Sequence, residues 1–517
     1  MYDSAEPSPL RLNRGEYRDK VLGCWTGKNI GGTLGGPFEG RTEMNDAAFY
    51  VQDLQGQPAP NDDLDLQLAW LLAAEERGIY GIDERVLGEY WLSHVSGPWN
   101  EYGVGKANMR AGLTPPLSGS CNNECWRISN GAWIRSEIWA CLFPGSPDEA
   151  AQYAYYDACC DHCGDGIYAE VFTAVMESAA FIESDIGALI RLGLSRIPEN
   201  SRVARAVKVA CAAHEAGLPF ADARAAVVKD SEDLGWFQAP GNLGFVVLGL
   251  LYGAGDFGRC VALATNCGDD ADCTAGTVGA LLGIVQGRAR LPRRWIEPIG
   301  ESIQTCAIDT YGRNTPRPVP KTVGELADRV VALAEEAQRG NGALPVFVDG
   351  PTALDAAYRE KLGDNAKVVE RVWKRSPYEL KFNLPHGLLS ADYKNGPYAA
   401  PGEPCEITFR VGGLRFIEKL AMVRLRLPEG WRAVGSDEGV LNVSHGHYPG
   451  VTLTFVPGEF SGAYAYLPVD VRLGDRLVPW TANLPLQRRG AVIYYASETY
   501  RDYWDARNRV VSRLPRL

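Results

Sequence analysis

The sequence contains no long hydrophobic run, no excess of basic residues and no apolar segment near its start. Its longest apolar stretch, around Phe245–Leu251, is short and interrupted by glycine, so we expect no membrane-spanning helix. The net charge of −12 argues against a surface for nucleic acid or for an anionic membrane. Residues Met1–Lys20 are polar and lack the apolar core of a signal peptide, which predicts a cytoplasmic protein.

Cysteine is plentiful but does not form the pattern of a disulfide framework. The 13 cysteines are an odd number and are scattered through segments with helical patterns. This distribution favours reduced, buried thiols in the cytoplasm. A zinc site would tolerate the spacings of Cys121, Cys125, Cys160 and Cys163, but their helical surroundings make buried thiols the favoured interpretation.

The sequence patterns divide the 517 residues into a helical part and a strand-rich part. Up to residue 340 the sequence has helical patterns and shows no alternation of strands and helices, which predicts an all-α domain over 1–340. Residues 341–375 are interrupted by glycine and proline at their start and are expected to form a linker. Residues 376–517 contain short alternating segments at about ten-residue spacing, which predicts an antiparallel, immunoglobulin-like β-sandwich.

A cluster of carboxylates lies in Thr265–Gly283, where the three aspartates Asp269, Asp270 and Asp272 precede a run of small and apolar residues. The run predicts a buried helix with Gly276, Ala280 and Gly283 near one face, for close contact with a neighbour. Carboxylates at the start of a buried helix need positive charge, and the helix dipole supplies only part of it. A divalent cation bound through oxygen would balance them. Alternatively, Asp269 caps the helix and the other aspartates are solvated.

A second acidic cluster precedes another predicted helix, about two hundred residues earlier in the chain. An N-cap role explains one or two of Asn61, Asp62 and Asp63. It explains less well Asp65, which lies one turn after Asp62 on the same face. We therefore expect the two clusters to form one site for two metal ions about 3.5–4 Å apart.

Two further segments carry candidate functional residues. Glu39 ends the glycine-rich turn G-G-T-L-G-G-P-F-E-G, whose spacing is not that of a phosphate loop; the turn could direct this side chain inward or leave it on the surface. Ser93–Arg135 is irregular and rich in tryptophan, asparagine, glycine and proline, which is typical of a functional segment. Its aromatic and amide side chains suit a sugar or a base, which makes substrate-binding candidates of Trp99, Asn100 and Tyr102.

Residues 17–338 resemble the ADP-ribosylglycohydrolase family, which includes dinitrogenase reductase-activating glycohydrolase. Three motifs carry the resemblance: G-C-W-T-G-K-N-I-G-G-T-L-G-G-P-F-E-G, N-D-D-L-D and G-D-D-A-D-C-T-A-G-T-V-G-A-L-L-G. The resemblance implies an all-helical fold that holds two Mg²⁺ ions, or Mn²⁺ or Ca²⁺, over the ribose hydroxyls of an ADP-ribosyl group. It also implies that water displaces this group at the anomeric carbon.

By this resemblance, metal ligands are expected at two motifs, and further residues are expected at the ligand cleft. Glu39 matches a carboxylate that gates the site or acts as base, and we take it with Asp63 as a catalytic candidate. Asn61 replaces the usual Ser or Thr, and Cys273 replaces the usual Thr although sulfur is a poor ligand for a hard ion. The expected metal ligands are Asn61, Asp62, Asp63, Asp270, Asp272 and Cys273, and the segment D-H-C-G-D-G-I-Y adds His162 and Asp165 as substrate-binding candidates.

The function that we predict is metal-dependent hydrolysis of the N- or O-glycosidic bond of an ADP-ribosyl group, attached to a small molecule or a protein. The added C-terminal domain, which short members of the family lack, keeps two alternatives open. One is hydrolysis of another glycoside or nucleoside on the same two-metal scaffold. The other is a non-catalytic binding or structural protein, which the retained acidic residues argue against.

Overall fold

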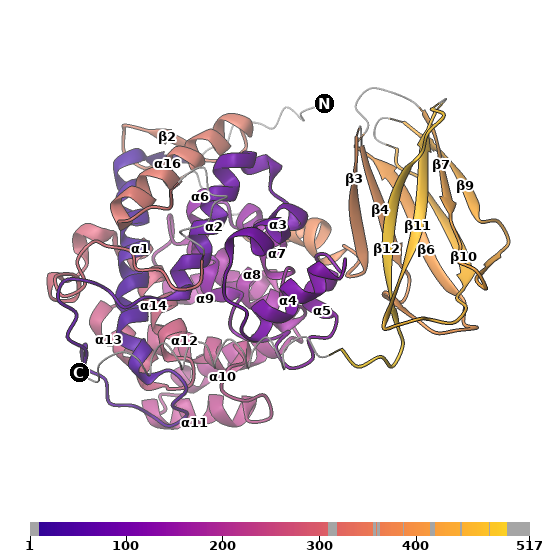
Figure 1. The fold of residues 1–517 in the computed structure, drawn as a ribbon. Coiled ribbons are helices and arrows are strands. Elements are labelled where there is room, and N and C mark those ends of the chain that lie inside the picture. Colours follow the sequence, from indigo (N-terminus) through magenta and orange to yellow (C-terminus); the bar gives the residue numbers. More distant parts are fainter. Residues whose placement is uncertain are drawn as a thin grey trace. The chain divides into compact units, whose positions relative to one another are not determined.

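The computed structural model describes residues 10–308, 318–354, 358, 362–385, 387–413, 419–444, 447–474 and 476–493. These residues form two compact units (Figure 1). The first comprises the described residues of Met1–Gly97 and Asn123–Lys374, and the second comprises those of Pro98–Asn122 and Arg375–Leu517. A segment from within the helical part of the sequence therefore belongs to the unit that contains the C-terminal strands.

The first unit is helical, as the sequence predicted, apart from a short parallel pairing of β1 (Arg11–Asn13) with β2 (Val346–Val348). No helix of the described residues is both long and apolar enough to cross a membrane. The helices of the first unit are α1 (Arg14–Gly35), η1 (Gly36–Phe38), α2 (Asp62–Arg77), η2 (Ile79–Gly81), α3 (Glu84–His94), η3 (Trp133–Arg135), α6 (Glu137–Leu142), α7 (Pro147–Ala158), α8 (Asp165–Ala179), α9 (Ile186–Arg196), α10 (Arg202–Glu215), α11 (Phe220–Ser231), α12 (Ala239–Gly253), α13 (Phe257–Asn266), α14 (Ala271–Gln286), η4 (Arg288–Arg290), α15 (Arg293–Ile296), α16 (Val323–Gly340), α18 (Ala366–Val368) and η5 (Val369–Trp373).

Helices α1 and α14 pack backbone against backbone, and this contact positions the site. A Cβ atom on Gly27 would lie less than 3.0 Å from the carbonyl oxygen of Gly279, and one on Gly23 would lie equally close to that of Gly283. Side chains would separate the helices, so glycine is needed at these crossings although it lowers helix propensity. The two helices run antiparallel, since earlier residues of α1 meet later residues of α14.

The row of α14 that faces α1 differs from the predicted row. Ala271, Ala275, Gly279 and Gly283 face α1 at four-residue intervals, so Gly283 has the predicted contact with a neighbouring helix. A Cβ atom on Gly276 would instead meet Asp63 of α2 and the side chain of Lys28 on α1. The helices pack along a row of residues spaced four apart, and this row lies only part of a turn from the predicted row.

The second unit contains two five-stranded sheets that share one hydrophobic core (Figure 1). The first sheet has the order β3-β4-β6-β10-β8 and the second β5-β12-β11-β7-β9. All pairings are antiparallel except that of β5 with β12, which is parallel and departs from the prediction. The strands are β3 (Glu379–Leu384), β4 (Gly387–Tyr393), β5 (Tyr398–Ala399), β6 (Cys405–Gly412), β7 (Lys419–Leu425), β8 (Arg432–Val434), β9 (Glu438–Val443), β10 (Gly450–Val456), β11 (Tyr464–Leu473) and β12 (Trp480–Arg488).

The segment Pro98–Asn122 contributes to the core of this strand-rich unit. It forms α4 (Asn100–Arg110) and α5 (Leu117–Ser120), so it is more regular than its sequence suggested. Leu113 and Leu117 are fully buried in the same hydrophobic cluster as the strands. The side-chain amides of Asn122 and Gln487 also exchange two hydrogen bonds, of 3.1 and 2.7 Å. The strand-rich unit is therefore built from two separate parts of the chain.

Candidate metal centre

Backbone hydrogen bonds hold the acidic start of α14 next to the glycine-rich turn. Gly268 has a φ angle of +81°, and a side chain there would collide with the carbonyl oxygen of Arg41. The Asp269 N–H donates to Arg41 O (2.7 Å), and the Gly40 N–H donates to Asp269 O (2.8 Å). These two hydrogen bonds hold Glu39 close to the first residues of α14.

Glu39, Asp270 and Asp272 form one group of converging carboxylates. Each offers an oxygen atom, and these atoms all lie within 4.8 Å of one another. Glu39 is exposed, whereas both aspartates are buried. Asp270 is oriented by Asn130, whose Nδ2 donates to Asp270 Oδ2 (2.7 Å), and by Asn242, whose Oδ1 accepts the Asp270 N–H (3.2 Å). Asp270 Oδ1 has no hydrogen-bond partner and remains available to a ligand.

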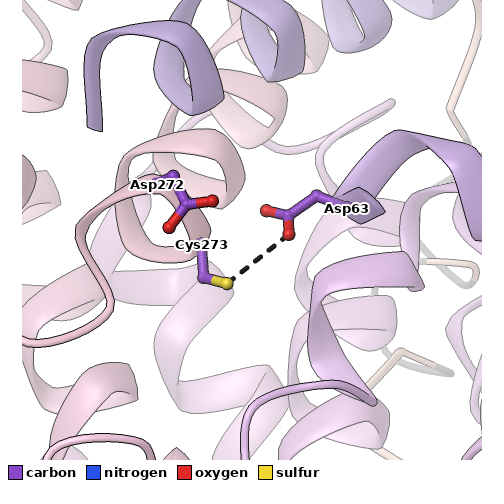
Figure 2. A group of neighbouring side chains, drawn as sticks. All are labelled: Asp63, Asp272 and Cys273. Atoms are coloured by element: carbon purple, nitrogen blue, oxygen red, sulfur yellow. Dashed lines mark hydrogen bonds between the residues drawn. The ribbon is translucent and has the colours of Figure 1, made fainter. Parts of the chain in front are cut away.

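Asp63, Asp272 and Cys273 form a second group, which shares Asp272 with the first. Asn61 caps α2 by accepting the Asp63 N–H at Oδ1 (2.7 Å), and its Nδ2 donates to Asp272 Oδ2 (3.1 Å). The Cys273 thiol donates to Asp63 Oδ1 (3.5 Å). Figure 2 shows the two carboxylates facing one another from α2 and α14, with the thiol beside them.

Burial and mutual repulsion disfavour the charged forms of these carboxyl groups. Burial raises the pKa of Asp270 well above its ordinary value, and the neighbouring Asp272 and Glu39 carboxylates raise it further. Burial also raises the pKa of Asp63, although the Lys28 ammonium opposes this change. A cation placed between the groups would oppose both effects, because it favours the ionised carboxylates.

The residues present fit a divalent cation. Asp270 Oδ1 and Asp272 Oδ1 are buried oxygen atoms without a hydrogen-bond partner, whereas Asp63 Oδ2 lies 3.7 Å from the Lys28 ammonium. Buried polar atoms are normally satisfied, so such a set converging on one place indicates a missing positive partner. Carboxylate oxygen is the ligand type that hard divalent cations prefer.

Lys28 supplies an internal positive charge at one edge of the centre. Its Nζ lies 2.8 Å from Glu137 Oε1 and 3.7 Å from Asp63 Oδ2, and it donates to the carbonyl oxygen of Ile134 (2.7 Å). Burial by itself lowers the pKa of Lys28, but Glu137 and Asp63 together raise it above its ordinary value. The lysine therefore stays protonated and holds Asp63 in place.

Replacing Lys28 by methionine is expected to destabilise the helical unit by about 3–5 kcal/mol, because two buried carboxylates lose their counter-charge. Urea denaturation measures the loss of free energy of unfolding, with hydrogen exchange in α1 and α2 as the readout. Lys208→Met is the control, since Lys208 is exposed and its ion pair with Glu199 spans 3.6 Å at the surface. A Lys28→Met protein as stable as the control would contradict the assigned role.

Three other predicted residues lie outside both groups. Asp62 is half-buried and follows the cap of α2. His162 is fully buried and bonded on both nitrogens, to Asp161 Oδ1 (2.8 Å) and to Ser129 Oγ (3.1 Å). Asp165 begins α8, and its Oδ1 accepts the N–H of Val203 at the start of α10 (2.9 Å). The contacts of His162 and Asp165 thus link parts of the helical unit.

The remaining candidates belong to the strand-rich unit or do not assemble. Trp99, Asn100 and Tyr102 lie at the start of α4, within Pro98–Asn122, and the rings of Trp99 and Tyr102 are 6.0 Å apart. The four cysteines considered for zinc do not form a metal-ligand group among the described residues. Cys121 lies in the core of the strand-rich unit and Cys125 is exposed in the helical unit, so that alternative is wrong.

Sequence reasoning missed the residues that orient the acidic groups. Lys28 lies in the glycine-rich helix α1, Glu137 lies at the start of α6, and Asn130 precedes the short helix η3. Only one local signal existed, since a lysine among the glycines of G-K-N-I-G-G lies in a helix that must pack closely. Asn242, in a glycine-rich helix start, gave no separate indication.

The ADP-ribosylglycohydrolase family model matches residues 13–340, which cover more than half of the chain. The protein belongs to the ADP-ribosylglycohydrolase family, as the sequence motifs predicted. Family membership implies a hydrolase, and the strand-rich C-terminal region follows the matched residues. No curated protein gives a match to this sequence.

Proposed function

We propose that this protein is a divalent-metal-dependent glycohydrolase that removes an ADP-ribosyl group by attack of water at the anomeric carbon. The bond cleaved is an N- or O-glycosidic bond to a small molecule or to a protein side chain. The observation that carries the proposal is the convergence of carboxylates from the starts of α2 and α14, where Asp270 and Asp272 each have a buried oxygen without a hydrogen-bond partner. Two ions are proposed, with Mg²⁺ first and Mn²⁺ or Ca²⁺ as alternatives.

The metal-holding residues are Asp63, Asp270 and Asp272, with Asn61, Asp62 and Cys273 as further candidates on the same two helix starts. When bound, two divalent cations would orient vicinal sugar hydroxyls and stabilise charge as the anomeric carbon becomes oxocarbenium-like. Asn130 and Asn242 keep Asp270 oriented for this purpose.

Glu39 is proposed as the general base. Its carboxylate is exposed, so water reaches it, and it lies within the group that contains Asp270 and Asp272. A base in this position can take a proton from the attacking water. Asp63, the second catalytic candidate, is buried against Lys28 and the Cys273 thiol, which supports an orienting role for it.

The substrate-binding candidates remain proposals. Trp99, Asn100 and Tyr102 are proposed to contact a sugar or base, and His162 and Asp165 to support the walls of the ligand cleft through their contacts within the helical unit. The thirteen free thiols suit a reducing compartment, which supports a cytoplasmic location.

Asp270→Asn is expected to lower the rate of hydrolysis at least about 100-fold, because it removes a charge that holds the metal at the reacting centre. Wild-type and variant proteins are incubated with ADP-ribosyl-arginine, O-acetyl-ADP-ribose, nucleosides and simple glycosides, with Mg²⁺, Mn²⁺ or EDTA. EDTA should abolish turnover by the wild type, and added Mg²⁺ or Mn²⁺ should restore it.

Asp222→Asn is the matched control, since Asp222 is an exposed residue in the first turn of α11. It should retain wild-type activity. Turnover that survives both EDTA and Asp270→Asn would refute metal dependence. Turnover of nucleosides or glycosides alone would replace ADP-ribose as the substrate and keep the mechanism.

A further inference from the structure

The two ligand groups of the metal centre differ in chemistry. Glu39, Asp270 and Asp272 offer oxygen atoms only, and one of the three is exposed to water. Asp63, Asp272 and Cys273 offer two carboxylates and a thiol, and all three are buried. Asp272 belongs to both groups, so the two positions are adjacent but have different donor atoms.

The Cys273 thiol points into the centre rather than into an apolar core. It donates to Asp63 Oδ1 (3.5 Å), and Figure 2 shows it next to the facing carboxylates of Asp63 and Asp272. A structural buried cysteine normally behaves as a small hydrophobic side chain. Here the thiol lies among carboxyl groups, one of which has a buried oxygen atom without a hydrogen-bond partner, Asp272 Oδ1. The unpartnered Asp272 Oδ1, on a side chain that is 7% exposed, is the second observation that indicates a ligand.

Sulfur and oxygen donors select different metals. Thiolate ligands favour zinc and related transition ions, whereas sets of carboxylate and water favour Mg²⁺, Ca²⁺ or Mn²⁺. A site with one thiolate and two carboxylates suits a borderline ion, and zinc accepts all three ligands. A site with three carboxylates and access to water suits Mg²⁺, which keeps several water ligands.

We infer that the two positions take different ions: a zinc-class transition ion between Asp63, Asp272 and Cys273, and a hard ion such as Mg²⁺ at Asp270 and Asp272, beside the proposed base Glu39. As the ion binds, the Cys273 thiol releases its proton to water and its sulfur donates an electron pair to the metal. This inference rests on the proposed function and refines it. The proposed function has two ions of the same kind, whereas here one of them is a transition ion.

Cobalt provides the test, since Co²⁺ replaces Zn²⁺ and gives a near-ultraviolet charge-transfer band when sulfur binds it. The full-length, metal-free protein is titrated with Co²⁺ in the presence of excess Mg²⁺. The expected result is a band that saturates at one equivalent of Co²⁺ and disappears on addition of Zn²⁺. Excess Mg²⁺ should not remove it.

Cys273→Ser should abolish the band and weaken Zn²⁺ binding at least about 100-fold, because a thiolate ligand is lost. Cys260→Ser is the matched control: Cys260 is also a buried thiol of the helical unit, its Sγ lies against the backbone of α12, and it belongs to neither ligand group. This control should keep both the band and the affinity. Circular dichroism checks that both variants are folded, and Cys273→Ala is the second variant if serine disturbs the helix.

Co²⁺ that binds without a sulfur band, or a band that survives Cys273→Ser, would overturn the inference. Hydrolysis with Mg²⁺ alone and no sulfur band would overturn it while leaving the proposed function intact. A sulfur band without hydrolysis of any substrate would support the mixed-metal centre and refute the proposed function.

Discussion

Replacing Gly35 by alanine is expected to destabilise the helical unit by about 2–3 kcal/mol and to weaken divalent-ion binding at least about 10-fold. A Cβ atom on this last residue of α1 would lie less than 3.0 Å from the Asp272 Cα atom and from the backbone of Ala271. Since backbone atoms cannot rotate away, α14 must shift. Any gain in helix propensity, at most about 1 kcal/mol, is smaller than this strain.

The shift matters for function because Asp272 belongs to both ligand groups, whereas Asp63 lies on a different helix. Moving α14 away from α1 changes the distance between these carboxylates. Isothermal titration with Mn²⁺ measures the affinity, and urea denaturation measures the stability.

The neighbouring glycine provides the control for this experiment. Gly36 is exposed, has helical backbone angles, and a Cβ atom there meets no atom within 4 Å. Gly36→Ala should therefore leave stability and metal affinity close to those of the wild type. If Gly35→Ala behaves in the same way, the close packing of α1 and α14 does not set the geometry of the centre.

Replacing Leu113 by aspartate is expected to destabilise the strand-rich unit by at least about 5 kcal/mol. Loss of a buried leucine typically costs about 2–5 kcal/mol, and a buried carboxylate without a partner adds to this. Leu113 is fully buried in the cluster that contains Phe409 and Leu484 of the two sheets. Hydrogen exchange measured by mass spectrometry should show that the amides of β6 and β12 lose protection in the variant.

Leu420→Asp is the control, because Leu420 lies on β7 with 59% of its side chain exposed. It should leave exchange in the strands unchanged. If the strands of Leu113→Asp stayed protected from hydrogen exchange, the segment Pro98–Asn122 would not be part of the core. The prediction is informative because this segment lies inside the part of the chain that the family model matches, residues 13–340.

The sequence alone was sufficient for the fold class and for locating the two acidic helix starts. Helical and strand patterns repeat over a few residues, so the change from helices to strands is visible without tertiary contacts. The same holds for Asp63 and Asp272, each of which lies in the first turn of a helix with a recognisable start. The two helix starts had to be paired by chemical argument and by the family resemblance.

Only the tertiary structure decided which residues orient, neutralise and bridge these groups. Lys28 reaches Asp63 and Glu137 because α1 packs within the helical unit, and no local pattern encodes that contact. His162, ambiguous in sequence, is bonded on both ring nitrogens inside the helical unit. Leu113 and Leu117 pack with strands that lie more than two hundred residues later in the chain. The physical reason is the same in each case: local propensity acts within a turn or a strand, whereas burial and charge pairing depend on which distant segments meet.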